Sequence, residues 1–571
     1  MENKLNQENI FWETPNNVER KYINYTFGQL HYRVSNPQNL SKTPLLCFHL
    51  SPNSSRVYNL FLSEMGKKRL CIAPDTPGFG QSDSYDFIPS IEDYAASFGE
   101  LIDSLKLKEI NLMGYHTGSK IALTLALQRP KQIKKIILVS APIYTNEELK
   151  KQKINMGHKN VDIPTDDGEH LLKRWSFGKK WADKKAPLIF HHREIAESLK
   201  GGEQSWWGHR AAFAVNHKDL LPKVFNPIII LCPNDDLWIP TQRSKNYINN
   251  GKLIELPDYG HGMLDVHTQT ITNTINNFLE AKSLEKNKTK KIPTPTYTNK
   301  NKSYIYKNYI KVFDKNIHYR ASSNFNKSNK PPLLCLHMSP NSSVIYEKLI
   351  KEMGKDRLVI APDTPGFGES DSPSFPPSIE YYAIIISKFI EKLNLDKVDV
   401  IGYHTGSITC IELAKQKPNL IRKIIQISSP IYFDEEIKIR KKQYNEKKIQ
   451  KDGSHLVDKW KFMVPFYGKN VPRNIMARNF AEGLRGGPKA HWGHQAAFSY
   501  DLKKTQPIID KPILIVNPND DLYLQTPRGL KYSKSAKIYT IKKYGHGFID
   551  LMTEEFSKII KRFLDIKEAK L

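Results

Sequence analysis

The sequence predicts an α/β protein in which one mostly parallel, doubly wound sheet is built twice in tandem. Apolar runs rich in Val, Ile and Leu alternate with helix-like stretches, as in parallel strands buried on both faces. Whole motifs recur 288 residues further on: Gly114–Gly118 reads GYHTG, and Gly402–Gly406 reads the same. With 571 residues, each half is long enough for a large buried core of its own.

The first half opens on a predicted hairpin, Tyr22–Ser35, which Tyr309–Ser322 echoes in the second half. Helix-like stretches such as Ser90–Leu105 and Gly118–Gln128 separate the strand-like runs that follow. Strand, helix, strand order implies right-handed crossovers, and ligands then bind beyond the carboxyl ends of the strands. The expected strands of the first half are Pro44–Leu50, Arg69–Asp75, Glu109–Tyr115, Lys134–Ala141, Asn226–Asp235 and Lys252–Pro257.

One interval in each half, about residues 143–226 and 431–511, lacks a clear strand. A helical lid inserted after the sixth strand, above the strand ends, would account for it. Both intervals contain Trp-Gly-His-x-Ala-Ala-Phe and Asp-Gly-x-His-Leu motifs. Such aromatic and histidine side chains could line a substrate pocket, or could simply pack lid helices together. The residues expected to face substrate are His209 and His494.

These patterns divide the chain into an extension (1–21), a first domain (22–281), a basic linker (282–308) and a second domain (309–569). The linker is rich in Lys, Asn, Thr and Pro and has no apolar periodicity, which predicts an exposed, partly extended segment. The extension lacks the apolar core of a signal peptide, and no run approaches the roughly 20 apolar residues of a membrane span. We expect the halves to pack as an intramolecular pseudo-dimer.

The chain carries 86 Lys and Arg against 59 Asp and Glu, a net charge of +27. A surplus of this size can indicate nucleic acid or anionic membrane. Here the basic residues are mainly Lys, dispersed over predicted helices and the linker, without a nucleic-acid-binding motif. We therefore expect a solvated Lys surface, a small-molecule partner, and neither nucleic acid nor membrane.

Cysteine usage points to a reducing compartment. None of the five cysteines shows CxxC spacing; four lie in apolar strand-like runs, and Cys410 lies in the helix-like run after the second elbow. Buried free thiols in a cytoplasmic protein are the expectation, with no cofactor indicated. The cysteines are Cys47, Cys71, Cys232, Cys335 and Cys410.

The repeated GYHTG motif has the spacing of Gly-x-Ser-x-Gly, a sharp strand-to-helix turn that lifts a serine hydroxyl above a sheet. In both copies, a histidine, His116 or His404, takes the place of that serine. Because the helix dipole at this position disfavours an imidazolium, we expect His116 to be neutral. It could then accept a hydrogen bond or ligate a metal.

Five motifs in one order, present in both halves, resemble the α/β-hydrolase superfamily with a lid of the haloalkane-dehalogenase or epoxide-hydrolase type. His49-Leu50-Ser51-Pro52 resembles the oxyanion loop, and Asp75 to Ser82 resembles the Asp-x-Pro-Gly-x-Gly-x-Ser turn. The elbow, an acid after a strand and a Gly-His pair complete the set. The resemblance covers about Tyr22 to Ala281 and Tyr309 to Ala569.

The resemblance implies a role for each matching residue. His261 and His546 match the general base. Their carboxylate partners are Asp236, favoured because Pro240 lies four residues on, and Asp521, although Gln525 replaces the proline there. Asp235 and Asp520 are the alternative acids. The expected oxyanion or substrate contacts are Ser51, Thr117, Ser339 and Thr405.

Four interpretations of the elbow histidine remain open. His116 and His261 could act together as acid and base, in hydrolysis or a proton-transfer lyase step on a small, partly apolar carbonyl or ester-like substrate. Ser51 could replace the missing nucleophile. His49, His116 and His261 could hold Zn²⁺, although the loop histidine is expected to brace its own loop, so no metal is assigned. Finally, each half could be an inactive small-molecule-binding pseudo-hydrolase. The acid–base enzyme is favoured because a retained acid–base pair has no evident use in a scaffold.

Overall fold

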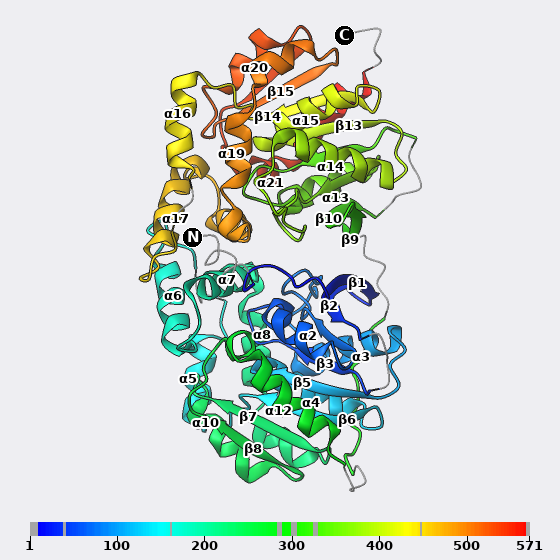
Figure 1. Cartoon of the computed structure of the whole chain (residues 1–571), viewed down its shortest axis with the longest axis vertical. Coiled ribbons are helices and arrows are strands. Elements are labelled where there is room, and N and C mark those ends of the chain that lie inside the picture. The colour runs from blue at the N-terminus through cyan, green and yellow to red at the C-terminus, as the bar shows by residue number, and fades with distance from the viewer. Residues whose placement is uncertain are drawn as a thin grey trace. The chain divides into compact units, whose positions relative to one another are not determined.

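The structure, a computed structural model, describes residues 10–37, 42–159, 163–282, 288–298, 305–323, 329–445 and 448–566. The chain separates into two compact units: Met1–Ile163 with His170–Lys302, and Pro164–Glu169 with Ser303–Leu571. Each unit contains one eight-stranded sheet flanked by helices (Figure 1).

The first sheet has the strand order β1-β2-β4-β3-β5-β6-β7-β8. β1 and β2 form an antiparallel hairpin, and β2 pairs antiparallel with β4, while β3 to β8 run parallel. The strands are β1 (Glu19–Tyr25), β2 (Gly28–Ser35), β3 (Leu45–Phe48), β4 (Cys71–Pro74), β5 (Ile110–Tyr115), β6 (Ile133–Val139), β7 (Ile228–Pro233) and β8 (Gly251–Leu256).

The second sheet repeats this topology, in the order β16-β15-β14-β13-β11-β12-β10-β9. The duplicated fold expected from the sequence is thereby confirmed. Its strands are β9 (Ile305–Val312), β10 (Lys315–Ser322), β11 (Leu333–Leu336), β12 (Val359–Pro362), β13 (Val398–Tyr403), β14 (Ile421–Ile427), β15 (Ile513–Pro518) and β16 (Ala536–Ile541).

Successive residues of the central strands enter opposite layers of the core. In β3, Leu46 and Phe48 pack into one hydrophobic cluster, whereas Leu45 and Cys47 pack into another on the other face. A strand covered on both faces needs apolar side chains at every position, which is why these strands read as unbroken apolar runs. All five cysteines are free thiols and buried, as expected.

The hairpins begin earlier than the sequence pattern indicated. β1 begins at Glu19, three residues before the expected boundary at Tyr22, and β9 begins at Ile305, four before Tyr309. In β1, Glu19 pairs with Val34 and both Glu19 and Lys21 are exposed. Such an edge strand is recognised through its partner, because polar outward residues interrupt any apolar run.

Helices connect the parallel strands and cover both sheets. α3 begins at a capping box in which Ser90 and Asp93 exchange hydrogen bonds. The connecting helices are α2 (Asn59–Met65), α3 (Ile91–Ser104), α4 (Thr117–Gln128), α10 (Trp238–Gln242), α11 (Met263–Val266) and α12 (Thr268–Glu280) in the first unit, and α13 (Glu347–Met353), α14 (Ile379–Lys392), α15 (Thr405–Gln416), α21 (Phe548–Leu551) and α22 (Thr553–Asp565) in the second.

The segments between the sixth and seventh strands of each sheet are helical, as expected for lids. Figure 1 shows α5 and α6, in cyan, along one side of the first sheet. The lid helices are α5 (Asn146–Asn155), α6 (Glu169–Trp181), α7 (Leu188–Leu199), α8 (Trp206–Ala214) and α9 (His217–Leu220), then α16 (Asp434–Gln443), α17 (Ser454–Tyr467), α18 (Arg473–Leu484), α19 (Trp492–Ser499) and α20 (Leu502–Thr505).

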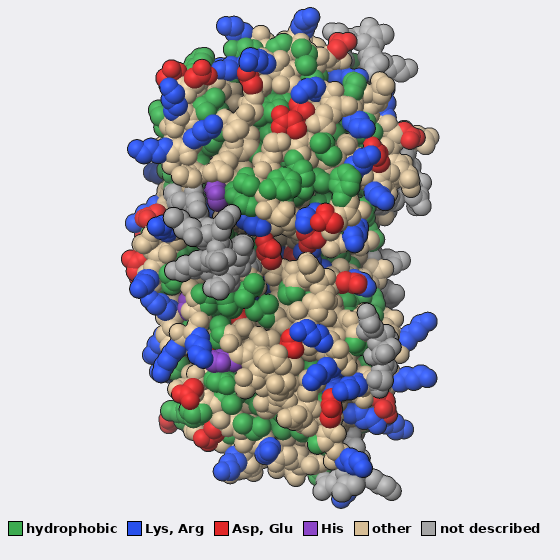
Figure 2. All heavy atoms as spheres, in the orientation of Figure 1, with side chains coloured by type: hydrophobic (Ala, Val, Ile, Leu, Met, Phe, Trp, Pro, Cys, Tyr) green, Lys and Arg blue, Asp and Glu red, His purple; other side chains and the backbone are tan. Residues whose placement is uncertain are grey.

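Within the predicted linker, residues 288–298 have no helix or strand and are mostly exposed, whereas residues 305–308 belong to β9. Residues 288–298 also contact the first domain. Ile292 N donates to Leu127 O, and Phe225 N donates to Thr289 Oγ1. On the face drawn in Figure 2, Lys and Arg side chains stand dispersed among acidic ones. Within the described residues, every helix is too short or too polar to cross a membrane.

Candidate active site

The elbow turn places His116 between the end of β5 and the start of α4. Its backbone lies at φ 50° and ψ −112°, and His404 repeats this conformation at φ 49° and ψ −112°. Such strain is typical of residues held for function. The flanking glycines are steric requirements: a Cβ on Gly114 would lie 2.2 Å from Gly118 O, and one on Gly118 would lie 2.1 Å from Phe48 O.

His116 forms an imidazole–carboxylate pair with Asp235, which follows β7. The distance from His116 Nε2 to Asp235 Oδ2 is 2.9 Å. Asp235 is buried, and it also accepts hydrogen bonds from Ser140 Oγ (2.6 Å) and from Leu237 N (2.8 Å). Because an ionised carboxylate only accepts, His116 Nε2 carries the proton of this bond and the lone pair lies on Nδ1. No described residue forms a hydrogen bond with that Nδ1.

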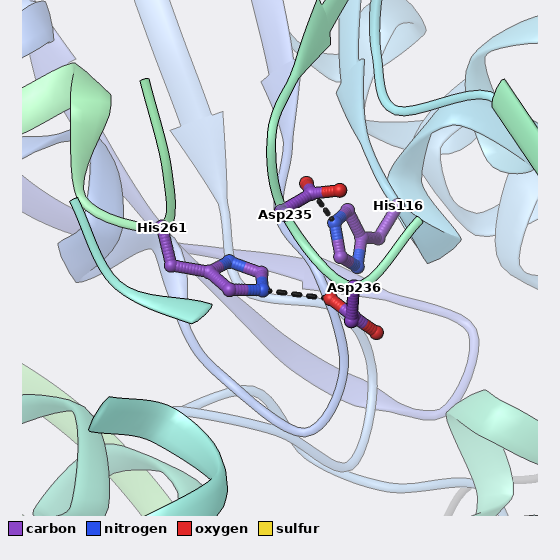
Figure 3. A group of neighbouring side chains, drawn as sticks. All are labelled: His116, Asp235, Asp236 and His261. Carbon is purple, nitrogen blue, oxygen red and sulfur yellow. Dashed lines mark hydrogen bonds and ion pairs between the residues drawn. The ribbon is translucent and has the colours of Figure 1, made fainter. Parts of the chain in front are cut away.

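A second pair, His261 with Asp236, lies beside the first. His261 Nε2 is 2.8 Å from Asp236 Oδ1, and its Nδ1 is 3.0 Å from the Tyr115 hydroxyl. The two imidazole rings are 5.1 Å apart, and Figure 3 shows the His116 ring between the two carboxylates. The contact expected between His261 and Asp236 is therefore present, and the alternative acid, Asp235, has a histidine of its own.

Burial and the neighbouring carboxylates act in opposite directions on His261. Burial alone would lower its pKa, but the hydrogen bond and charge of Asp236, with the charge of Asp235, outweigh it and raise the pKa to about 9. Burial alone would raise the pKa of Asp236, yet the hydrogen bond from His261 and the nearby imidazoles bring it to about 2. The pair therefore favours an imidazolium facing a carboxylate at neutral pH.

The second unit repeats this cluster. His404 Nε2 is 3.2 Å from Asp520 Oδ2, to which Ser428 Oγ also donates at 2.6 Å. His546 Nε2 is 3.0 Å from Asp521 Oδ1, and its Nδ1 is 3.1 Å from the Tyr403 hydroxyl. Here the elbow histidine lies between both acids, since His404 Nε2 is also 3.7 Å from Asp521 Oδ1.

A cavity of about 700 Å³ in the first unit collects most of the expected site residues: His116, His261, Asp236, Ser51, Thr117 and His209 line it. The lid touches the oxyanion loop closely, because a Cβ on Gly208 would lie 2.1 Å from Ser51 Oγ. Steric fit therefore requires glycine at this position of the Trp-Gly-His motif.

The lid histidines of both units pack against aromatic rings of their own lids. His209 stacks on Phe213, with ring centres 5.9 Å apart. His494 packs 4.3 Å from Tyr444, and burial lowers its pKa to about 3. Ser339 and Thr405 are buried in the second unit. Ser51 lines the cavity of the first unit, and its role as a nucleophile stays a prediction.

The zinc interpretation with three histidines is wrong about His49. His49 Nε2 accepts from Thr76 N at 2.9 Å, and its Nδ1 lies 2.8 Å from Leu50 O. Both nitrogens thus brace the oxyanion loop, and burial lowers the pKa of His49. The groups that could hold a metal contain two aspartates in its place: His116, Asp235, Asp236 and His261, and His404, Asp520, Asp521 and His546.

Two kinds of supporting side chain were not predicted from the sequence, a serine after the sixth strand and the tyrosine before the elbow histidine. Ser140 holds Asp235 from a positive φ of 57°, and Ser428 does the same for Asp520 at 51°. A signal was available, since a serine follows the sixth strand in both halves. Tyr115 was also overlooked, although the tyrosine before the elbow histidine is repeated.

This fold and this elbow define the class of protein. A family model described as the alpha/beta hydrolase fold matches residues 43–268 and 331–550, so the chain belongs to that family, twice over.

Among curated proteins, the chain is similar to the uncharacterized hydrolase YugF of Bacillus subtilis, 23% identical over 277 residues (45% of this chain, 97% of the relative). It is also similar to the putative carbamate hydrolase RutD of Yersinia enterocolitica, 23% identical over 42% of this chain and 87% of the relative. Among solved structures, the enol-lactonase of Burkholderia xenovorans is 18% identical over 45% of this chain and all of that chain, with a TM-score of 0.39.

Proposed function

We propose that each unit hydrolyses a small, partly apolar substrate with an ester-like carbonyl, by attack of water and without a covalent intermediate at the elbow. The observation that carries this proposal is the placement of His116. Its Nε2–H is tied to Asp235, its ring lines the cavity, and its Nδ1 is left as a proton acceptor. A histidine oriented by a carboxylate in this way is suited to general-base catalysis.

In the proposed reaction, water gives a proton to His116 Nδ1 while its oxygen bonds to the carbonyl carbon. The carbonyl π electrons move to oxygen, and backbone N–H groups near Ser51 and Thr117 are the proposed donors to that oxyanion. The intermediate collapses by breaking the bond to the leaving-group oxygen, which takes a proton from the His261 imidazolium. Proton return from His116 to His261 through solvent restores both groups, so ester and water give acid and alcohol.

A second candidate function is small-molecule binding without turnover. It is favoured by the fact that both nitrogens of His261 are engaged, one by Asp236 and one by Tyr115. A sensor would keep this network intact with its ligand bound, whereas the hydrolase must break the contact with Asp236 when the proton leaves.

The hydrolase proposal is tested by screening esters, lactones and carbamates, the last because one relative is named a putative carbamate hydrolase. The decisive variant is His116→Gln/His404→Gln, with exposed His158→Gln as the control. We expect kcat/KM to fall by about 100-fold or more in the double variant, and to stay unchanged in the control. Unchanged turnover in the double variant would remove His116 and His404 as bases.

The nucleophile is tested separately with an activated fluorophosphonate probe for serine. We expect no labelling. Labelling that disappears in Ser51→Ala would show instead that Ser51 is the nucleophile.

A further inference from the structure

At each elbow, two imidazoles and two carboxylates bring their ligand atoms close together. In both units, one atom from each of two histidines and two aspartates lies within 4.8 Å of all the others. In the second unit the measured edges are 3.2 Å (His404 to Asp520), 3.7 Å (His404 to Asp521) and 3.0 Å (His546 to Asp521). A tetrahedral Zn²⁺ with bonds of about 2.0–2.1 Å needs edges of about 3.3 Å.

The charge of the cluster matches a divalent ion. Once the imidazolium proton has left, two carboxylates and two neutral imidazoles carry −2 together, and Asp235 and Asp520 are buried. Buried charges in proteins are paired or coordinate metals. Two imidazole nitrogens with two carboxylate oxygens suit a first-row divalent cation such as Zn²⁺.

In the second unit, hydrogen bonds from neighbouring residues orient the side chains that would bind a metal. The Tyr403 hydroxyl donates its single proton to Asp520 Oδ2 at 3.2 Å, so its contact with His546 Nδ1 must use the histidine's proton. With Nδ1 protonated, His546 Nε2 faces the Asp521 carboxylate either with a second proton or with a lone pair available for a cation. Ser428 and Leu522 N fix the other carboxylate, as supporting groups do around metal ligands.

We propose that each elbow cluster is a divalent-cation site, binding one Zn²⁺-class ion per unit, and that the ion switches off hydrolysis. The ion would take the Nε2 atoms that hold the protons of both histidine–aspartate pairs. Its binding moves the proton of His116 to Nδ1, so the base is lost, and removes the proton that His261 would donate. Four protein ligands also complete a tetrahedral shell and leave no position for water.

Metal binding is independent of the proposed hydrolysis, whereas the inhibitory role of the ion rests on that proposed function. Tag-free, full-length protein is stripped with chelator and dialysed against Zn²⁺, and bound metal is measured per chain. We expect two ions in the wild type, one in Asp236→Asn and none in Asp236→Asn/Asp521→Asn. A matched control is His267→Gln, which breaks a histidine–aspartate pair outside the cluster (His267 Nε2 to Asp183 Oδ2, 2.9 Å) and should retain two ions.

Two further measurements on the wild type avoid any dependence on variant folding. Co²⁺ should give the visible d–d absorption of a four-coordinate ion, and binding should release protons, detected by calorimetry in buffers of different ionisation enthalpy. Absence of Zn²⁺ binding, or two ions retained in the Asp236→Asn/Asp521→Asn variant, would overturn the site.

The effect of the ion on hydrolysis is measured separately from its binding. If a substrate is found, chelator-treated protein should turn over faster than Zn²⁺-loaded protein, with half-inhibition at the Zn²⁺ concentration that half-saturates the site. Turnover that requires Zn²⁺ would overturn the inhibitory role while leaving the site in place. Turnover indifferent to Zn²⁺ at full occupancy would do the same.

Discussion

The buried amine of Lys120 allows a quantitative test of how burial affects the pH dependence of stability in the first unit. The second unit has an apolar residue at the equivalent position. Lys120 lies in α4, one turn beyond the elbow, and donates to the carbonyl oxygens of Ala212 and Val215 in the lid. Burial lowers its pKa to about 7, although Asp219 partly opposes the shift. At the equivalent position of the repeat stands Ile408.

The sign of the pH dependence follows from the lowered pKa. Between about pH 7 and pH 10.5 the unfolded chain binds a proton on this lysine that the folded unit does not, so stability rises with pH. For pKa values of about 7 folded and about 10.5 unfolded, the destabilising contribution is about 4 kcal/mol at pH 7 and about 2 kcal/mol at pH 9. The difference between the two pH values is therefore about 2 kcal/mol.

The perturbation is Lys120→Met, which keeps the chain length and removes the charge. Loss of the two hydrogen bonds to the lid carbonyls changes stability by an amount that does not depend on pH. The difference in unfolding free energy between variant and wild type should therefore shift by about 2 kcal/mol from pH 7 to pH 9, in favour of the wild type at the higher pH.

Urea unfolding of the full chain, followed by tryptophan fluorescence at both pH values, measures this difference. The variant Ile408→Met in the second unit is the control and should show no pH-dependent difference. An equal stability difference for Lys120→Met at pH 7 and pH 9 would refute the reasoning, because it would mean that the lysine is charged, or neutral, to the same extent in both states.

Three further predictions concern packing. Glu197→Gln removes the buried carboxylate that Arg56 contacts at 3.0 Å, and should destabilise the first unit by about 3 kcal/mol in urea unfolding. The control Glu109→Gln, which breaks an exposed ion pair, should cost less than about 1 kcal/mol. Equal losses of stability in the two variants would contradict this prediction. Gly208→Ala should displace the lid from Ser51 and weaken binding of any cavity ligand, and unaltered affinity would argue against that contact. The intramolecular pseudo-dimer stays a prediction. Small-angle scattering should show a compact particle, and two separated domains in an extended particle would exclude the pseudo-dimer.

Much of the candidate site was accessible from the sequence, because it depends on residues next to one another in the chain. The GYHTG spacing fixes a turn in which any side chain on Gly114 would collide with the backbone of Gly118, and that steric condition is local. The condition on Gly118 is tertiary, because the backbone that a side chain there would meet is that of Phe48 in β3. The position of Pro240 after Asp236 likewise selected the acid that contacts His261.

The partner of His116 was beyond such reasoning. Asp235 and Asp236 are adjacent in sequence, yet they lie against different histidines. What separates them is the order of strands: β6 lies beside β7, so Ser140 reaches Asp235 and turns it toward the elbow. The hairpin edges escaped for a similar reason, since β1 is defined by pairing with β2 and not by an apolar pattern.

The sequence by itself determined the duplicated α/β fold, the lids, and the histidine at each elbow, because these follow from periodicity, repeats and local sterics. Only the tertiary structure decided which carboxylate holds which imidazole, and hence which nitrogen carries a proton. Hydrogen-bond geometry is set by groups that meet from the ends of separate strands, at distances where a displacement of one ångström changes the partner.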